Sequence, residues 1–175
     1  VAIAPLTNEN QWEAGEGRPA SVQAPQNTSY VGAEELNKRL KEKNILLIDL
    51  ASSRAYRAGH IPGAHFVIRS RLAAALPKLA QAPTLVMTSE EGTQAAFACS
   101  DGFAFDGEVL ALSGGTIAWV AAGYALVSSS DGFAEAPDDV MLKPSELTEG
   151  REDAMRDYLS GSDDLLEKVE RDGTL

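Results

Sequence analysis

The sequence predicts an α/β fold with a mostly parallel central sheet and helices on both faces. Short apolar runs of the kind that form buried strands recur between residues 45 and 112, and helix-like stretches separate most of them. Strands and helices that alternate in this way form parallel sheets covered on both sides. The chain has 175 residues, of which 44% are hydrophobic, so it is long enough to bury one such core.

Each expected element follows from the spacing of its apolar residues. Leu36 and Leu40, for example, lie one helical turn apart, and the run that follows them is of buried-strand type. Ligands of such sheets bind at the carboxyl ends of the strands, so the segment after Met87 is the first place to search for chemistry. The expected elements, in order, are a helix over 31–40, strands over 45–50 and 65–68, a helix over 70–79, a strand over 84–87, a helix over 94–103, a strand over 109–112 and a helix over 116–122.

The net charge of −11 is unevenly distributed along the chain. Residues 1–27 contribute −2, residues 28–128 are neutral, and residues 129–175 contribute −9. We therefore expect a linker or N-terminal arm over 1–27, one domain over 28–128, and an acidic C-terminal extension over 129–175 with short helices over 144–159 and 163–169. An acidic protein repels nucleic acid and anionic lipid, so neither a nucleic acid nor a membrane is an expected partner.

Cysteine and histidine are scarce. Cys99 is the single cysteine, so it has no partner for an internal disulfide, and its apolar surroundings predict a core position. No Cys/His cluster has the spacing of a metal site, and we expect no metal and no cofactor. The chain has no visible signal peptide, which favours the cytoplasm. Because it begins at Val1 rather than Met, we expect a truncated N-terminus, and a periplasmic location stays open.

Two sequence motifs suggest a family. The first runs from Asp49-Leu50 through Tyr56 to the turn Gly59–Ala64 (Gly-His-Ile-Pro-Gly-Ala), and the second combines Gly114-Gly115 with Trp119 and Gly123-Tyr124. At this separation they resemble the entry and closing motifs of the rhodanese (sulfurtransferase) domain. The resemblance covers roughly residues 29–127 and implies the rhodanese-like fold.

The C-terminal extension supports a larger parent protein. Residues 141–144, 154–159 and 170–173 resemble the extension of multi-domain tandem rhodaneses. The resemblance implies that this chain is the C-terminal domain of a longer polypeptide. Its expected partners are therefore other rhodanese domains, in the same polypeptide or in a second chain.

The loop after Met87 departs from the family pattern. Active rhodaneses have Cys-x-x-Gly-x-Arg here, because a thiolate accepts the sulfane sulfur and a cation stabilises the anionic donor. An alignment on Gly92 assigns Ser89 to the position of the catalytic cysteine and Gln94 to that of the arginine. A serine hydroxyl forms no persulfide, and Glu90 and Glu91 repel an anion, so we expect a small sulfur anion to bind only weakly. The predicted binding loop is Glu90, Glu91, Gly92, Thr93 and Gln94.

The same residues have structural interpretations as well. Thr88, Ser89 and Glu91 fit a helix N-cap with a capping-box carboxylate. Asp49, at a strand end, is expected to accept backbone N–H groups of a neighbouring loop. His60 belongs to the turn motif, and for both Asp49 and His60 a role in maintaining the fold competes with a supporting role in the site.

Two functions remain open from the sequence. The first is a rhodanese-like domain without the catalytic cysteine, which acts as a non-catalytic binding or regulatory module of a sulfurtransferase protein. The alternative is a sulfurtransferase of the thiosulfate:cyanide type that has Ser89 at the nucleophile position. The resemblance names the enzyme family, and the loop predicts that this domain is inactive.

Overall fold

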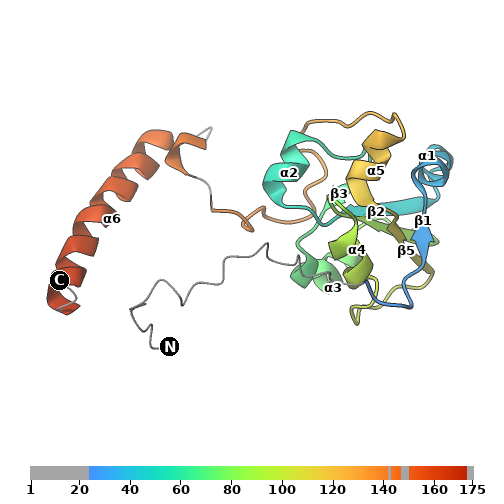
Figure 1. Cartoon of the computed structure of the whole chain (residues 1–175), viewed down its shortest axis with the longest axis horizontal. Coiled ribbons are helices and arrows are strands. Elements are labelled where there is room, and N and C mark those ends of the chain that lie inside the picture. The colour runs from blue at the N-terminus through green and yellow to red at the C-terminus, as the bar shows by residue number, and fades with distance from the viewer. Residues whose placement is uncertain (1–23, 142, 147–149, 173–175) are drawn as a thin grey trace, which may run out of the picture.

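A five-stranded, all-parallel sheet forms the centre of the computed structural model, which describes residues 24–141, 143–146 and 150–172 (Figure 1). Its strands are β1 (Tyr30–Val31), β2 (Ile45–Asp49), β3 (His65–Phe66), β4 (Thr84–Thr88) and β5 (Glu108–Leu112). Their order across the sheet is β1-β5-β4-β2-β3, so β4 lies in the middle. All neighbouring pairs run parallel. The predicted fold class is therefore confirmed.

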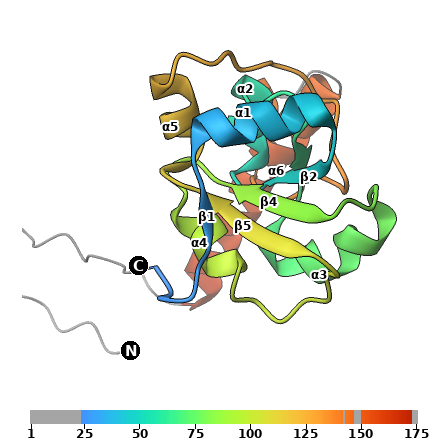
Figure 2. The same ribbon diagram turned by 90° about the vertical axis from the view of Figure 1, so that its right-hand side faces the viewer.

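Helices cover both faces of this sheet (Figure 2). The helices are α1 (Ala33–Glu42), α2 (Ser53–Ala58), α3 (Leu72–Ala75), α4 (Thr93–Ala98), α5 (Gly115–Ala121) and α6 (Arg151–Asp172), with 3₁₀ turns η2 (Arg69–Arg71), η3 (Leu76–Lys78) and η4 (Pro144–Glu146). Side chains of α3 and α4 pack on one face of the sheet, and those of α1, α2 and α5 pack on the other.

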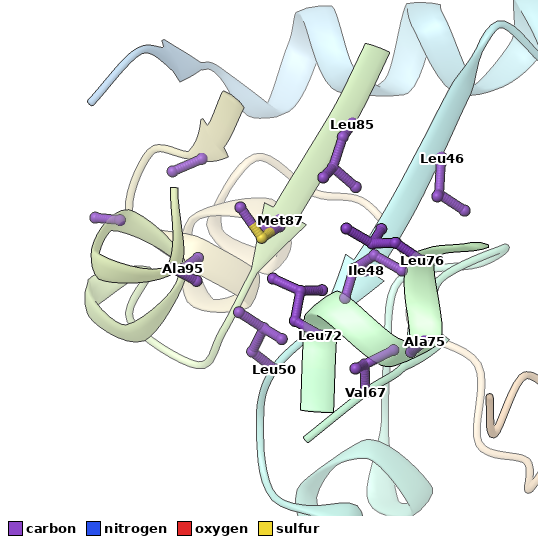
Figure 3. Close-up of a cluster of buried hydrophobic side chains, with 13 residues drawn as sticks. Leu46, Ile48, Leu50, Val67, Leu72, Ala75, Leu76, Leu85, Met87 and Ala95 are labelled. Atoms are coloured by element: carbon purple, nitrogen blue, oxygen red, sulfur yellow. The ribbon is translucent and has the colours of Figure 1, made fainter. Parts of the chain in front are cut away.

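The alternation of side chains along the central strands produces two cores. Leu85 and Met87 of β4 point toward α3 and α4, together with Leu46 and Ile48 of β2 (Figure 3). Val86, which lies between Leu85 and Met87 in β4, belongs to the core on the opposite face, which contains residues of α1, α2 and α5. Because successive side chains of a strand point to opposite faces, a strand covered on both sides has to be apolar throughout. This requirement explains the uninterrupted apolar run of β4.

Several elements differ from their predicted form. Helix α1 begins at Ala33 rather than at residue 31, because Val31 belongs to strand β1 and pairs with Leu112 of β5. The sequence did not predict β1 or α2. The helix predicted over 70–79 is divided into η2, α3 and η3, since Pro77 has no N–H for a continuous helix. Helix α4 ends at Ala98 instead of residue 103, and a turn at Cys99 and Ser100 follows it.

Residues 131–139 contact the sheet domain, although the charge distribution assigns them to the C-terminal extension. The carboxylate of Asp139 accepts a hydrogen bond from the Ser53 N–H at 2.8 Å, at the start of α2. The carboxylate of Glu135 accepts one from the Ile68 N–H at 2.5 Å. The ring of Phe133 packs against two buried aromatic rings. These acids therefore serve the fold by accepting from backbone N–H groups.

The C-terminal extension contains one long helix rather than the two short helices that the sequence predicts. Helix α6 is continuous over Arg151–Asp172, since Gly161, between the predicted helices, remains helical. Figure 1 shows α6 apart from the sheet, and its residues Tyr158 and Leu159 are 65% and 58% exposed, so these apolar side chains do not pack onto the domain. Across the described residues, no helix has the length and apolar character needed to cross a bilayer.

Candidate functional site at the end of the central strand

The segment that follows β4 forms a short loop at the carboxyl end of the sheet. Residues 89–92 connect β4 to α4, and this is the position at which parallel α/β sheets bind their ligands. Ser89 is buried, with 4% of its surface exposed, whereas the side chains of Glu90 and Glu91 lie in solvent. The segment that the sequence predicts as a binding loop therefore lies at the carboxyl end of β4.

Backbone contacts determine the shape of this loop. The carbonyl of Ser89 accepts hydrogen bonds from the N–H groups of Gly92, at 3.2 Å, and Thr116, at 3.0 Å. The carbonyl of Glu90 accepts one from the Ile117 N–H at 3.0 Å. Gly115 lies so close that a Cβ added to it would be 2.1 Å from the Ser89 carbonyl oxygen. The loop is thus fixed by the first turn of α5.

The predicted capping box does not form. Helix α4 has Gly92 as its N-cap, with φ +84°, and no side chain caps it at that position. The reason is that β4 continues through Thr88 and the helix begins only after the glycine, so Thr88 and Glu91 lie too early in the chain. Ser89 still serves the helix, since its Oγ accepts a hydrogen bond from the Ala95 N–H at 3.3 Å.

The side chains around the loop give a negatively charged mouth. A cavity of about 240 Å³ opens here. Arg69, from η2 on the far side of Gln94, is held by Asp101 through two hydrogen bonds of 2.8 Å. The cavity therefore presents two carboxylates and several neutral groups to a ligand. Its lining residues are Ala51, Ser52, Ser89, Glu90, Glu91, Thr93 and Gln94.

Asp49 and His60 have different positions relative to the loop. Asp49 pairs with Thr88 across β2 and β4, and its Oδ1 accepts a hydrogen bond from the Ala51 N–H at 2.9 Å. The donor is two residues further along the same segment, whereas the sequence predicted donors from a neighbouring loop. Burial raises the pKa of Asp49 to about 6. The ring of His60 instead stacks on the ring of Tyr56, with 3.7 Å between the ring centroids, and His60 does not line the loop cavity.

The remaining thiol lies behind the loop. Cys99 is half-buried and packs against the core shown in Figure 3. Burial raises the pKa of Cys99 to about 11, so the thiol is almost entirely protonated near neutral pH. Among the described residues, no group of histidine, cysteine or acidic side chains is arranged to hold a metal ion.

A second cavity, of about 450 Å³, adjoins the loop and was not found by sequence reasoning. It lies between α2 and α5, and Asp49 and Glu90 line it together with apolar side chains. The sequence contains a faint signal of this cavity, because Ile117 and Val120 are three residues apart and therefore lie on one face of α5. Both side chains are exposed in the structure. The other walls of the cavity come from α2 and from the segment after α5, and only tertiary structure brings them next to Ile117 and Val120.

Comparison with known proteins gives the family. A family model described as the rhodanese-like domain matches residues 32–122, just over half of the chain. The chain belongs to the rhodanese-like family. The match includes the loop and the first motif, and it extends through Gly114-Gly115 and Trp119 of the second motif to Ala122. A comparison with curated proteins gave no match.

Solved structures agree with this assignment. The crystal structure of thiosulfate sulfurtransferase from Pseudomonas aeruginosa matches with 32% identity and a TM-score of 0.80, over 97% of this chain and 32% of that one. The chain thus spans about a third of the length of the Pseudomonas protein. A protein from Anabaena matches with 25% identity and a TM-score of 0.50, over 57% of this chain and 83% of its own. A Bacillus halodurans protein shares the fold at 18% identity and a TM-score of 0.50, over 66% of this chain and 85% of its own.

Proposed function

We propose that this chain is a non-catalytic, rhodanese-like module of a multi-domain sulfurtransferase protein. The observation that carries the proposal is Ser89 at the first position of the loop after β4. A thiolate attacks the outer sulfur of thiosulfate, forms a persulfide and releases sulfite. A serine hydroxyl is a poor nucleophile without an adjacent base, and the hydrogen bond of Ser89 Oγ comes from the Ala95 backbone N–H.

The charge around the loop supports the same function. Glu90 and Glu91 line the cavity in which an anionic donor would bind, and Gln94 adds no positive charge. At a separation of ~5 Å and an effective dielectric constant of ~20, each like-charge contact opposes binding by roughly 3 kcal/mol before salt screening. Arg69 is already held by Asp101. An anion such as thiosulfate would therefore bind weakly.

The partners that we propose are other rhodanese domains of the same polypeptide or of a second chain. The Pseudomonas thiosulfate sulfurtransferase is about three times as long as this chain, and its match extends over 97% of these residues. Leu159 and Met155 lie one helical turn apart on α6, and both are exposed. Such an apolar helical face needs a partner surface, which a neighbouring domain would provide. A second Gly-His-Ile-Pro-Gly-Ala motif in the natural polypeptide would support this proposal, and a natural protein with a single rhodanese domain would contradict it.

A sulfur-transfer experiment tests the loss of catalysis. The protein and its Cys99→Ala variant are incubated with thiosulfate, and intact mass is measured for the gain of one sulfur atom, followed by a thiocyanate assay with cyanide. We expect neither adduct nor turnover. Turnover that survives the Cys99→Ala change would refute the proposal and favour the alternative, a sulfurtransferase that uses the loop as it stands.

A gain-of-function variant tests the assignment of the loop itself. In the Cys99→Ala background, Ser89→Cys combined with Gln94→Arg supplies the thiol and the cation that the family pattern contains. We expect a sulfur adduct at position 89, and more of it when Glu90→Gln is added. The matched control is Gln94→Arg alone, which adds the charge without the thiol. A folded Ser89→Cys variant without any adduct would show that the alignment on Gly92 is wrong.

A further inference from the structure

The cavity between α2 and α5 is apolar along its walls. Ala55 and Ala58 form the α2 side, and Leu126 closes the end near Gly59. On the α5 side, Ile117 and Val120 are 56% and 50% exposed, respectively. Figure 1 shows these two helices next to each other on one side of the sheet. A volume of about 450 Å³ is within the range of pockets that bind small organic molecules.

A buried carboxyl group lies at one end of this cavity. Asp49 lines it although only 1% of the residue is exposed. One carboxylate oxygen accepts from the Ala51 N–H. No fully buried side-chain oxygen among the described residues lacks a partner, so the second oxygen, which makes no hydrogen bond, keeps its small accessible surface where Asp49 lines the cavity. Buried carboxylates normally have a cation or several donors beside them. Asp49 therefore has an unused acceptor that faces a ligand-sized space.

The charges around the cavity favour a positively charged ligand. Glu90 lines the cavity as a second carboxylate, and none of its lining residues is lysine or arginine. Burial is the largest effect on the pKa of Asp49 and leaves it raised, although the hydrogen bond from the Ala51 N–H and the charge of His60 both lower it. A cation beside Asp49 would offset the unfavourable burial of its ionised form. An anion would meet two negative charges in an apolar setting.

We propose that the cavity between α2 and α5 binds a small organic cation, a primary ammonium group on an apolar body about the size of benzylamine. The ammonium group donates to the free oxygen of Asp49, and the apolar body lies against Ile117 and Val120. Glu90 adds a longer-range attraction at the rim. This site is separate in chemistry from sulfur transfer, so it holds whether or not the loop is catalytic.

Three probes of one shape and different charge test the proposal. Benzylamine, benzyl alcohol and benzoate are titrated into the ¹⁵N-labelled protein at pH 7.5, and amide shifts are followed by NMR. We expect benzylamine to bind about tenfold or more tightly than benzyl alcohol, since a charge-assisted hydrogen bond replaces a neutral one. Benzoate should bind weakest, and the shifts should concentrate at Ala51 and along α5. Equal affinities for the three probes, or shifts confined to another face, would overturn the proposal.

Variants locate the binding energy. Asp49→Asn should weaken benzylamine about tenfold and leave benzyl alcohol unchanged, whereas Val120→Trp, which fills the mouth from an exposed position, should weaken both probes. Glu90→Gln should weaken benzylamine two- to threefold, and it tests the charge preference even if the buried substitution impairs folding. Asp106→Asn is the matched control, because this exposed carboxylate lies just before β5, at the amino-terminal end of the strands, whereas Asp49 lies at the carboxyl end of β2. A benzylamine preference that survives both Asp49→Asn and Glu90→Gln would refute the site.

Discussion

Substitution of Asp49 by asparagine should change the way in which stability depends on pH. The carboxyl is buried, and burial raises its pKa from an ordinary value of 3.8 to about 6. A difference of about two pKa units corresponds to about 3 kcal/mol. Because the folded-state pKa is the higher one, this contribution is fully present below pH 3.8 and is lost as the pH rises through 6. Asparagine keeps an acceptor for the Ala51 N–H and has no such titration.

Urea denaturation followed by circular dichroism measures the effect. Between pH 4 and pH 7.5, the wild type should lose about 2 kcal/mol of unfolding free energy relative to Asp49→Asn. Asp101→Asn is the control of opposite sign, since Arg69 lowers the pKa of Asp101 and its contribution is lost at acid pH instead. A wild-type minus Asp49→Asn difference that stays constant over this range would show that Asp49 is not desolvated as described.

Three further changes test other contacts. Gly115→Ala, whose Cβ would lie 2.1 Å from the Ser89 carbonyl oxygen, should lower the free energy of unfolding by about 3 kcal/mol or more. Gly123→Ala has open space around it and should lower it by only about 1–2 kcal/mol because of its positive φ. Similar losses for the two variants in urea denaturation would contradict the contact. Tyr56→Phe removes a hydroxyl that lies within hydrogen-bond distance of the Ala64 and Asp131 carbonyls. We expect the free energy of unfolding to fall by about 1–2 kcal/mol in the same assay, and an unchanged value would contradict this contribution. Cys99, with its pKa raised to about 11, should react with iodoacetamide at pH 7.5 on the order of 100-fold more slowly in the native protein than in urea, and equal rates would mean that the thiol is not shielded.

The strands that the sequence predicts well are those whose burial leaves a continuous apolar run. β4 is buried at every residue, so its pattern is hard to mistake. β1 has only two residues, Tyr30 and Val31, and no periodicity can identify so short a strand. Helix α2 has six residues, and its one local signal is Ser52, whose side chain accepts from the Ala55 N–H. Short elements of this kind form because of tertiary contacts rather than local pattern.

The position of the loop was predictable, but its shape was not. The rule that ligands bind at the carboxyl ends of parallel strands depends only on fold class. The shape depends on Gly115, which approaches the Ser89 carbonyl from a distant part of the chain. The capping box that local sequence favours does not form, because β4 continues through Thr88 and α4 begins only after Gly92. The cavity beside the loop likewise combines three separate segments. Sequence periodicity contains no information on how such segments meet.

The dependence of the loop on backbone contacts has a consequence for how this domain changes over evolutionary time. The carbonyls of Ser89 and Glu90 are held by N–H groups of Thr116 and Ile117, so backbone contacts determine most of the path of residues 89–91, and the Ser89 side chain adds its hydrogen bond from the Ala95 N–H. Residues that perform chemistry and residues that hold architecture are therefore separable in this fold. We expect a change of the side chain at position 89 to alter the free energy of unfolding by about the contribution of one hydrogen bond, roughly 1 kcal/mol. Measurements of folding alone would not distinguish an active relative from an inactive one.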